Sequence, residues 1–434
     1  MRRREALEAM AVGAITTTAG CITSSPNTPP PSAWEYDISD VLAVEGTETR
    51  TIIAAERELV GLTRDDGDVS WQHSDMSIAG LERDENSYYA YGSGGILAVD
   101  PRNGKKQWDI GGSYQWLYPA ESTIVCYASN GRETRGLDPE TGETVWTWEG
   151  DMIYTYTPTF GLVPGDEYRG FNLEEGSVTW TFNEGDDQTP VTVADGVIVF
   201  WVRAESTAAL VALDQATGTE QWRFEVTDDR YGDGGVIDGT LYASIDGGTD
   251  PTRLHAIDIE SGRNRWSTTI ETGFDVSRVT PDIDIGGTVI ATAPPNDPLP
   301  GTCAIDRTTG TIEWCKRDHE LITTTDDYVV LEGNGGDFVG LEPDGSAAWE
   351  GGMQAVPRVG SPASDGLVYT PPEIVTFGDS FVAAFTGTNA VESWDATAGT
   401  RRWRKSLEST VDALFAANDD LYIVADGTLS AVDR

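Results

Sequence analysis

The sequence predicts an all-β protein, a single closed β-propeller, and three observations support this prediction. First, one motif recurs: an apolar run ends in Asp, a Gly follows four positions later and a Trp four positions after that, as in Asp214, Gly218 and Trp222. Second, successive motifs are separated by 34 to 54 residues that hold several short apolar segments. Third, the two ends of the chain carry complementary halves of the motif.

The motif itself predicts a β-hairpin. The apolar residues before Asp214 form one strand, the short Asp side chain accepts hydrogen bonds from the N–H groups of the turn, and Gly218 supplies a positive φ. Trp222 then lies on the returning strand. Because a lone hairpin cannot bury its own apolar face, we expect each Trp to act as a wedge between neighbouring sheets.

Nine copies of the motif run along the chain, and three of them are altered. Asn172 replaces the acid before Trp180, Thr63 replaces it before Trp71, and the copy from Glu342 to Trp349 is one residue shorter. With the isolated Trp34, the tryptophans expected to act as wedges are Trp34, Trp71, Trp108, Trp146, Trp180, Trp222, Trp266, Trp314, Trp349 and Trp403.

The chain ends predict how the ring closes. Trp34 lies on a short strand with no Asp–Gly half before it, and Asp433 ends an apolar run with no Trp after it. If the N-terminal strand completes the last blade, no exposed sheet edge remains. Ten four-stranded blades follow from the motif count, with eight as the alternative if weak copies fuse or lie outside the ring.

The run Ala212-Leu213-Asp214 with Thr217-Gly218 and Trp222 resembles the tryptophan-docking repeat of PQQ-type (pyrroloquinoline quinone) β-propellers. This family includes quinoprotein alcohol dehydrogenases and the lipoprotein subunit of the bacterial β-barrel assembly machinery. The resemblance covers nearly the whole chain after its first residues. It implies the fold and says little about activity, because one fold serves many functions.

The charge of the chain is extreme, with 72 acidic against 29 basic residues and a formal net charge of −43. Acid spread along the chain, with Arg far outnumbering Lys, resembles proteins of salt-in halophilic archaea. Molar salt makes such self-repulsion tolerable because it shortens the Debye length to about 3 Å. Nucleic acid is not expected as a partner, since phosphate contacts require clustered cations.

Three regions are predicted along the chain. Residues 1–20 combine Arg2-Arg3-Arg4 with a short apolar run and resemble a twin-arginine export signal. Thr18-Ala19-Gly20-Cys21 resembles a lipobox, which implies cleavage before Cys21 and a lipid on that residue. Residues 21–32 are rich in Pro, Ser and Thr and are expected to form an extended tether. Residues 33–434 form the propeller.

Long connections mark one face of the expected ring. In a propeller the connections from the second to the third strand of a blade, and from one blade to the next, share a face. Segments 203–208, 226–234, 246–253 and 294–301 are expected to be such connections, and loops on a rigid scaffold often carry binding. The interval between Trp349 and Trp403 could add a hairpin or a cap.

The resemblance also raises the hypothesis of quinone-dependent catalysis. Dehydrogenases of the family hold the quinone between a Trp and a ring made by adjacent cysteines, with Ca²⁺ nearby. Here Cys21, Cys126, Cys303 and Cys315 are all separate, and the calcium ligands match no motif. We therefore predict no cofactor and keep PQQ with Ca²⁺ as the alternative.

The cysteines and histidines favour structural roles. A hairpin with a three-residue loop Thr308-Thr309-Gly310 would place Cys303 opposite Cys315, which predicts a disulfide in an exported protein. Cys126 lies in an apolar strand and is expected to be a buried small side chain. The three histidines lie in different units without the spacing of a zinc site, so no metal or catalytic residue is predicted.

These expectations favour a non-catalytic, lipid-anchored propeller on the outer face of the cell membrane. It would bind or scaffold an unknown protein or small molecule, and the domain itself would be monomeric. A PQQ-dependent oxidoreductase is the alternative, and a binder of sugar or peptide is a third possibility. The barrel-assembly role is not expected in a cell that has no outer membrane.

Overall fold

The computed structural model describes most of the propeller region. The described residues are 32–74, 76–129, 132–150, 152–185, 187–204, 207–226, 230–246, 252–270, 278–285, 287–292, 301–324, 328–333, 337–352, 373–377, 380–384, 389–417 and 420–432. Residues 1–31, including Cys21, lie outside this set.

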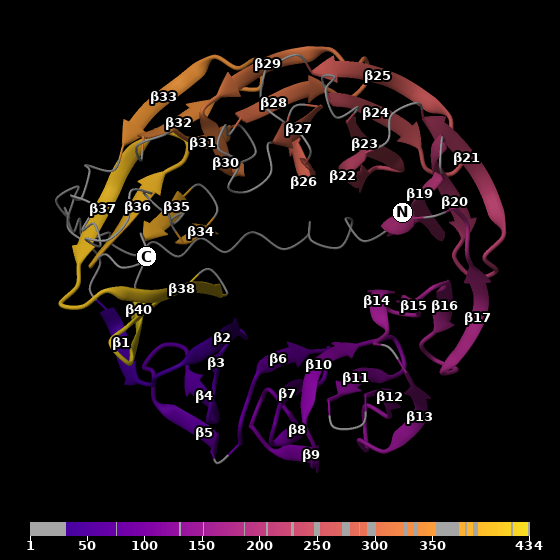
Figure 1. Cartoon of the computed structure of the whole chain (residues 1–434). Helices are drawn as coiled ribbons and strands as arrows, with labels where there is room; N and C mark the ends of the chain where they lie inside the picture. Colours follow the sequence, from indigo (N-terminus) through magenta and orange to yellow (C-terminus); the bar gives the residue numbers. More distant parts are fainter. Residues whose placement is uncertain are drawn as a thin grey trace, which may run out of the picture.

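Ten four-stranded antiparallel sheets form a ring around a central opening (Figure 1). The predicted all-β propeller is confirmed, with ten blades rather than eight. Nine of the blades are consecutive in sequence, and the tenth combines the first strand of the chain with the last three. Within the described residues, no helix has the length and apolar character needed to cross a membrane.

Each blade has strands A to D, from the centre of the ring to its rim. Blades 1 to 3 consist of β2 (Val41–Gly46), β3 (Arg50–Ala55), β4 (Glu58–Thr63) and β5 (Val69–Ser74); β6 (Gly80–Arg83), β7 (Tyr88–Gly92), β8 (Gly95–Val99) and β9 (Lys106–Ile110); and β10 (Tyr114–Pro119), β11 (Ile124–Ala128), β12 (Glu133–Leu137) and β13 (Thr144–Glu149).

Blades 4 to 6 include the longest strands. They consist of β14 (Tyr154–Thr157), β15 (Phe160–Val163), β16 (Tyr168–Asn172) and β17 (Ser177–Phe182); β18 (Asp187–Ala194), β19 (Val197–Ala204), β20 (Thr207–Asp214) and β21 (Glu220–Val226); and β22 (Arg230–Ile237), β23 (Thr240–Asp246), β24 (Thr252–Asp258) and β25 (Asn264–Ile270).

Blades 7 to 10 complete the ring. They consist of β26 (Arg278–Ile285), β27 (Thr288–Thr292), β28 (Gly301–Asp306) and β29 (Ile312–Arg317); β30 (His319–Thr324), β31 (Val329–Gly333), β32 (Asp337–Leu341) and β33 (Ala347–Gly352); β34 (Glu373–Phe377), β35 (Ser380–Ala384), β36 (Ala390–Asp395) and β37 (Thr400–Ser406); and β38 (Val411–Ala417), β39 (Asp420–Ala425), β40 (Thr428–Val432) and β1 (Ser32–Asp37).

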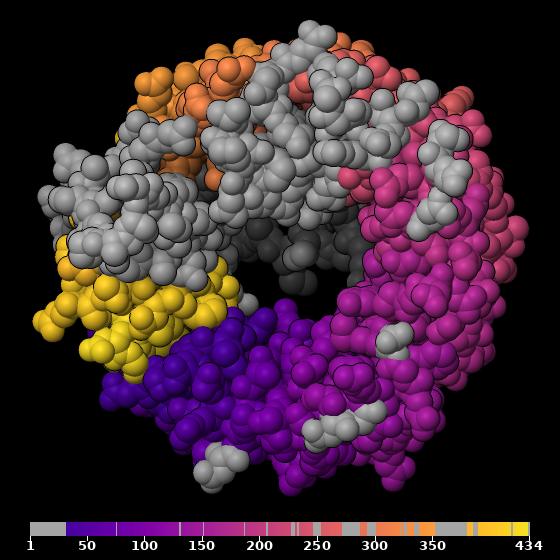
Figure 2. Space-filling view, viewed as in Figure 1, coloured from indigo at the N-terminus to yellow at the C-terminus, as the bar shows by residue number. Residues whose placement is uncertain are grey.

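The strand order gives the ring two distinct faces. The A–B and C–D turns lie on one face, called here the C–D face. The B–C turns and the connections between blades lie on the other, called here the B–C face. The space-filling view shows the opening at the centre of the ring (Figure 2).

The ring closes through β1, which pairs antiparallel with β40 and places Trp34 opposite Ala431. Blade 10 is also joined to blade 1 by an ion pair of 2.5 Å between Arg64 and Asp420 and by a hydrogen bond of 2.9 Å between the hydroxyls of Thr51 and Tyr422. The predicted closure by the N-terminal strand is therefore confirmed. Ser32, expected in the tether, already belongs to β1.

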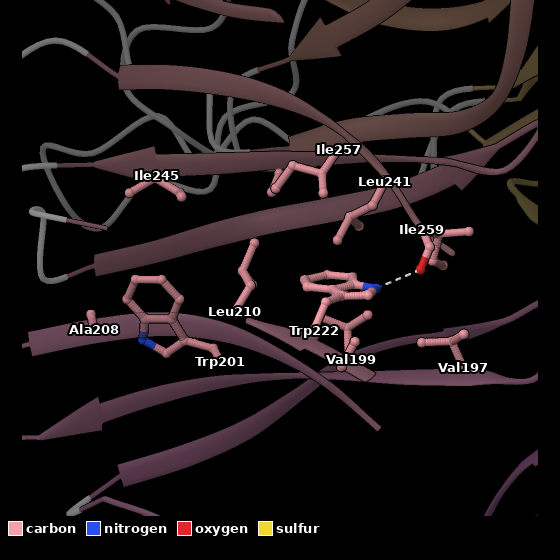
Figure 3. Close-up of a cluster of buried hydrophobic side chains, with 12 residues drawn as sticks. Val197, Val199, Trp201, Ala208, Leu210, Trp222, Leu241, Ile245, Ile257 and Ile259 are labelled. Carbon is pink, nitrogen blue, oxygen red and sulfur yellow. Dashed lines mark hydrogen bonds between the residues drawn. The ribbon is translucent and has the colours of Figure 1, made fainter. Parts of the chain in front are cut away.

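The hydrophobic core is divided among the blade interfaces. Among the residues that the structure describes, ten clusters of buried side chains occur, one between each pair of neighbouring blades. Figure 3 shows the cluster between blades 5 and 6, where Val199 and Leu210 of one blade meet Leu241 and Ile257 of the next. Each sheet is thus buried only because its neighbours are present.

Candidate functional site

The repeated motif builds a docking site between neighbouring blades. The indole N–H of Trp222 in blade 5 donates a hydrogen bond of 2.7 Å to the carbonyl of Ile259 in blade 6 (Figure 3). Its ring lies against Gly262, where a Cβ atom would be only 2.5 Å from Cδ2 of the indole. Gly262 therefore serves two purposes, because its φ of +67° forms the turn and its missing side chain makes room for the ring.

Eight of the ten tryptophans make the equivalent hydrogen bond. In every case the acceptor is the carbonyl of the residue that directly follows the acid position in the next blade. The pairs are Trp34 with Arg64, Trp108 with Pro139, Trp146 with Leu173, Trp180 with Gln215, Trp222 with Ile259, Trp266 with Arg307, Trp314 with Pro343 and Trp349 with Ala396, at 2.7–3.0 Å. All eight rings are buried.

Trp71 and Trp403 depart from this pattern. Trp71 lies against Gly104 of blade 2, but its indole nitrogen has no hydrogen-bond partner in the part of the chain that the structure describes. A ring nitrogen of the neighbouring His73 lies 2.7 Å from the Gly104 carbonyl instead. Trp403 is partly buried against the cluster between blades 9 and 10. The acid position of the next blade is Asp433, which lies outside the described residues, and so does the residue after it, whose carbonyl would be the expected acceptor.

A small residue faces each of the ten motif tryptophans across its hairpin. The sequence analysis missed this feature. Gly61 pairs with Trp71, for example, and a Cβ at Gly61 would lie 2.2 Å from the indole. The ten residues are Gly61, Ala98, Gly136, Gly170, Ala212, Ala256, Ala304, Gly340, Ser393 and Ala431. The signal is present in the sequence, because each precedes the acid position by two.

The residue that directly follows the tryptophan on strand D also faces a residue of strand C, and the interaction between these two residues differs from blade to blade. It holds the disulfide between Cys303 and Cys315 in blade 7, a hydrogen bond of 2.9 Å between His255 and Ser267 in blade 6, and an ion pair of 2.9 Å from Arg404 to the buried Glu392 in blade 9. These pairs join strands C and D near the rim, and each lies within one blade.

The register that opposes the two cysteines arises differently from our expectation. The turn pairs Asp306 with Thr311, since the N–H of Asp306 donates to the carbonyl of Thr311. A β-bulge at Glu313 then adds one residue and brings Cys303 opposite Cys315. The extra residue also sets Trp314 opposite Ala304.

The acids of the motif stabilise their own turns. Hydrogen bonds from Arg265 and then from Ser261 lower the pKa of Asp258 to about 2. Hydrogen bonds from the hydroxyl and the N–H of Thr217 lower the pKa of Asp214. Hydrogen bonds from the hydroxyl and the N–H of Thr309 likewise lower the pKa of Asp306. These carboxylates accept hydrogen bonds from residues of their own hairpins, as Asp side chains in turns commonly do.

His255 and Cys126 are buried titratable groups that lie away from the turns. Burial, and then the charge of Arg253, lowers the pKa of His255 to about 4, so the ring is neutral at neutral pH. Burial raises the pKa of the Cys126 thiol to about 12, which keeps it protonated. Neither group has the exposure and activation that a nucleophile or a general base needs.

The B–C face is raised over blades 5 and 6. Strands β18, β19 and β20 have eight residues each, whereas β14 and β15 of blade 4 have four. Since the motif acid fixes the other end of strand C, the added residues extend these blades toward the B–C face. Trp201 of blade 5 and Tyr231 of blade 6, with ring centroids 5.7 Å apart, join the two extensions.

The raised wall corrects part of the expected loop pattern. Residues 203–204 and 207–208 belong to β19 and β20, and residues 230–234 belong to β22, so these segments are largely strand. Most of segments 246–253 and 294–301, and residues 353–372 of the longest interval, lie outside the described residues.

The cysteine arrangement does not fit the quinone site that the resemblance implies. That site requires a ring formed by adjacent cysteines, whereas Cys303 is bonded to Cys315 across a hairpin and Cys126 is a buried free thiol. Among the described residues, no three or more His, Cys, Asp or Glu side chains are grouped so as to hold a metal ion.

Comparison with known families decides the relationship. A model of the family described as outer membrane protein assembly factor BamB matches residues 92–201 and 206–434. The chain belongs to this family. The match begins in blade 2 and runs through blade 10. The repeats that resemble those of PQQ-type β-propellers are therefore the same repeats that the BamB family model matches.

Three solved structures match the chain at low sequence identity. BamB from Moraxella catarrhalis is 17% identical, with 93% of this chain and 100% of that chain covered and a TM-score of 0.43. Quinohemoprotein alcohol dehydrogenase from Comamonas testosteroni is 14% identical, with 92% and 76% covered and a TM-score of 0.40. A eukaryotic initiation factor is 8% identical, with 83% and 96% covered and a TM-score of 0.57. No protein of curated function matches the chain.

Proposed function

We propose that this BamB-family propeller is a non-catalytic scaffold that binds a partner protein through its B–C face. The observation that carries the proposal is the raised wall over blades 5 and 6, built on a ring whose blades are fixed to one another by buried tryptophans. A rigid body that presents one uneven face can position a partner without moving itself. The family description, an assembly factor, supports a role in protein interaction.

The proposal includes export and attachment to the outer face of the cell membrane by a lipid on Cys21. The support is the Arg-rich start and the Thr18-Ala19-Gly20-Cys21 sequence. Ser32 begins β1 at the C–D face, so the preceding segment joins the propeller on the face opposite the raised wall. A Cys21→Ser variant should move from the membrane fraction to the medium. Retention of this variant in the membrane would contradict the anchor.

A high-salt environment is also part of the proposal, because the net charge of −43 repels itself in dilute solution. Raising KCl from about 0.1 M to about 2 M shortens the Debye length from about 10 Å to below about 3 Å. The temperature midpoint of unfolding should rise over this range. A midpoint that falls or stays constant would remove the halophilic assignment.

Site-specific cross-linking tests the scaffold function. A photoreactive residue is placed at Thr207, which is exposed at the B–C end of β20, or at Ala216, which is exposed in the C–D turn of the same blade. After irradiation of intact cells, we expect a discrete adduct from Thr207 that Ala216 does not give. Adducts of the same kind from both positions, or none from Thr207, would contradict binding at the B–C face.

A further inference from the structure

A row of aromatic and hydroxyl side chains crosses blade 3. Strand pairing places Trp116 of β10 opposite Tyr127 of β11, and Tyr127 opposite Thr134 of β12. Thr134 is in turn opposite Trp148 of β13. Opposed residues of antiparallel strands point to the same side of a sheet, so the four side chains lie in one line. These four residues are called here the blade 3 row.

The blade 3 row faces blade 4, its neighbour in the ring (Figure 1). Trp116 and Trp148 pack against the buried cluster between the two blades, and Trp148 contacts Phe171 of blade 4 edge to face at 5.4 Å. Trp148 is the last residue but one of β13, and D strands end at the B–C face. The rings of Trp116, Tyr127 and Trp148 are partly exposed. The row therefore lies at the B–C end of the interface between blades 3 and 4.

Two buried polar atoms of the row lack a partner. Within the described residues, neither the Thr134 hydroxyl nor the Trp148 indole N–H makes a hydrogen bond. Trp146, two residues earlier on the same strand, donates its N–H to the carbonyl of Leu173 at 2.9 Å. Buried polar groups are nearly always hydrogen-bonded, because an unmade bond lowers stability. Since the two unpaired atoms belong to directly opposed residues, one polar group placed between them can bond both.

This side of blade 3 carries no charge. The second row that its strands present to blade 4 is formed by Tyr118, Val125, Gly136 and Trp146, so all eight residues are uncharged. On blade 4, Arg169 lies two residues before Phe171 and points to the same side, but it is paired with Glu167 at 3.2 Å. The net charge of −43 also repels anions. These features favour a neutral ligand.

A sugar has both kinds of surface that the row requires. The C–H groups of a pyranose ring form a flat apolar face, which suits the flat apolar faces of aromatic rings. Each sugar hydroxyl can accept a hydrogen bond from the indole N–H and donate one to the threonine oxygen. A peptide suits the row less well. It brings a fixed N–H for almost every carbonyl, and the side chains of the row offer only hydroxyl oxygens as acceptors.

The row is long enough for more than one sugar ring. Neighbouring strands lie about 4.8 Å apart, so the distance from β10 to β13 is about 14 Å. At the inner end, one face of Trp116 is stacked on Tyr118 with ring centroids 6.2 Å apart. At the rim end lie the two unpaired atoms of Thr134 and Trp148. A disaccharide could therefore stack on rings at one end and form hydrogen bonds at the other.

We propose that Trp116, Tyr127, Thr134 and Trp148 form a binding site for a neutral glycan at the boundary of blades 3 and 4. The two unpaired atoms are closed off from solvent, so a sugar hydroxyl reaches them when the Trp148 indole turns aside. The hydroxyl then accepts from the indole N–H and bonds the Thr134 oxygen. The site is separate from the protein contact proposed for the raised wall, and the proposal does not depend on that contact.

Saturation-transfer NMR with neutral disaccharides tests the site. Cellobiose, lactose and N,N′-diacetylchitobiose are added one at a time to the intact chain. We expect transfer to at least one of them, strongest at the C–H protons of one ring face. Thr134→Val removes the unpaired hydroxyl and should weaken binding of that sugar about threefold or more, the effect of one lost hydrogen bond. Its unfolding midpoint should not fall, because the variant buries no unpaired group at this position.

A matched variant and a second variant control the test. Thr147→Val makes the same change at an exposed position of β13, next to Trp148, and should leave binding unchanged. Trp148→Phe keeps a ring and removes the N–H, so it should also weaken binding.

Three results would overturn the proposal: no transfer to any of the three disaccharides, stronger transfer to glucuronate or to N-acetyl-alanine amide, or unchanged affinity in both Thr134→Val and Trp148→Phe. The Thr207 cross-link is measured separately, so failure of the glycan site leaves the scaffold function standing.

Discussion

At the scale of the residue, one indole ring carries each blade interface. Trp222 is buried between two sheets, donates its N–H across the interface and lies against a glycine of the next turn. The alanine opposite it, Ala212, is small enough to leave space for the ring. The packing of the Trp222 ring therefore depends on Ala212 in its own blade and on Gly262 and the Ile259 carbonyl in the next blade. Loss of any one of these groups weakens the interface between the two blades.

Truncation of Trp222 tests this dependence. Trp222→Ala should lower the free energy of unfolding by about 3 to 5 kcal/mol, because it removes a buried ring and leaves a cavity. Trp222→Phe should cost less, since it keeps a ring and loses the hydrogen bond to Ile259. Chemical denaturation measures both, with Val145→Ala as a surface control expected within about 0.5 kcal/mol. A loss below about 1 kcal/mol for Trp222→Ala would contradict the wedge role.

His255 gives the interior a dependence on pH. Its pKa of about 4 in the folded state lies below the ordinary value near 6.5, so the unfolded chain binds a proton that the folded chain does not. Stability is therefore full above about pH 6.5 and falls as the pH drops toward 4, by about 2 kcal/mol between pH 7.5 and pH 5.

His255→Gln should flatten the curve of unfolding free energy against pH between 7.5 and 5. The turn carboxylates do not interfere, because lowered pKa values such as that of Asp258 make their contribution fall only at a more acidic pH. Denaturant titrations at several pH values measure the slope. The same slope in both proteins would show that His255 titrates normally.

At the scale of the element, the C–D turn combines a backbone function and a packing function in one glycine. Gly262 and Gly196 both have positive φ, of +67° and +77°. A Cβ at Gly262 would meet the Trp222 ring at 2.5 Å, whereas a Cβ at Gly196 would have nothing within 4 Å. The two positions therefore separate the cost of the conformation from the cost of the contact.

Alanine at these positions measures the two costs. Gly196→Ala should lower the free energy of unfolding by about 1 kcal/mol, the cost of placing a Cβ in the left-handed region. Gly262→Ala should cost clearly more, about 3 kcal/mol or above, because the indole must also move. Equal losses in denaturant titrations would show that the turn glycine does not support the neighbouring ring.

The hairpins were predictable from the sequence, and the links between them were less so. Asp214, Gly218 and Trp222 specify a local turn, and local turn chemistry is legible in one chain. The small residue before each motif acid was also legible, but its reason appears only when Ala212 is seen opposite Trp222.

At the scale of the whole molecule, the ring is closed by one strand. The opposite ends of the chain meet in β1 and β40, and Trp34 then docks on blade 1 like any other wedge. Closure was predictable because the two half-motifs are incomplete alone. The raised wall was not, because the sequence of β19 and β20 shows strand-like residues without showing which face they extend.

The raised wall follows from the ring, because it requires blades 5 and 6 to be neighbours at a fixed angle. Ten separate clusters, one for each interface, imply that loss of one interface weakens its two blades first. The two ends of the chain meet inside blade 10, where β1 pairs with β40. The closed ring therefore depends on the pairing of these two strands.

An engineered disulfide between β1 and β40 tests the closed ring most directly. Glu35 faces Ser430 in the same position of the hairpin that Cys315 and Cys303 occupy in blade 7, so the chain contains its own template. In Glu35→Cys with Ser430→Cys, we predict that mass spectrometry of a non-reducing digest finds the two peptides linked, as it finds Cys303 linked to Cys315. Glu35→Cys with Asp412→Cys, which places the second thiol on the innermost strand, should stay unlinked. Free thiols at positions 35 and 430 alongside an oxidised Cys303–Cys315 pair would contradict the closure of the ring by the N-terminal strand.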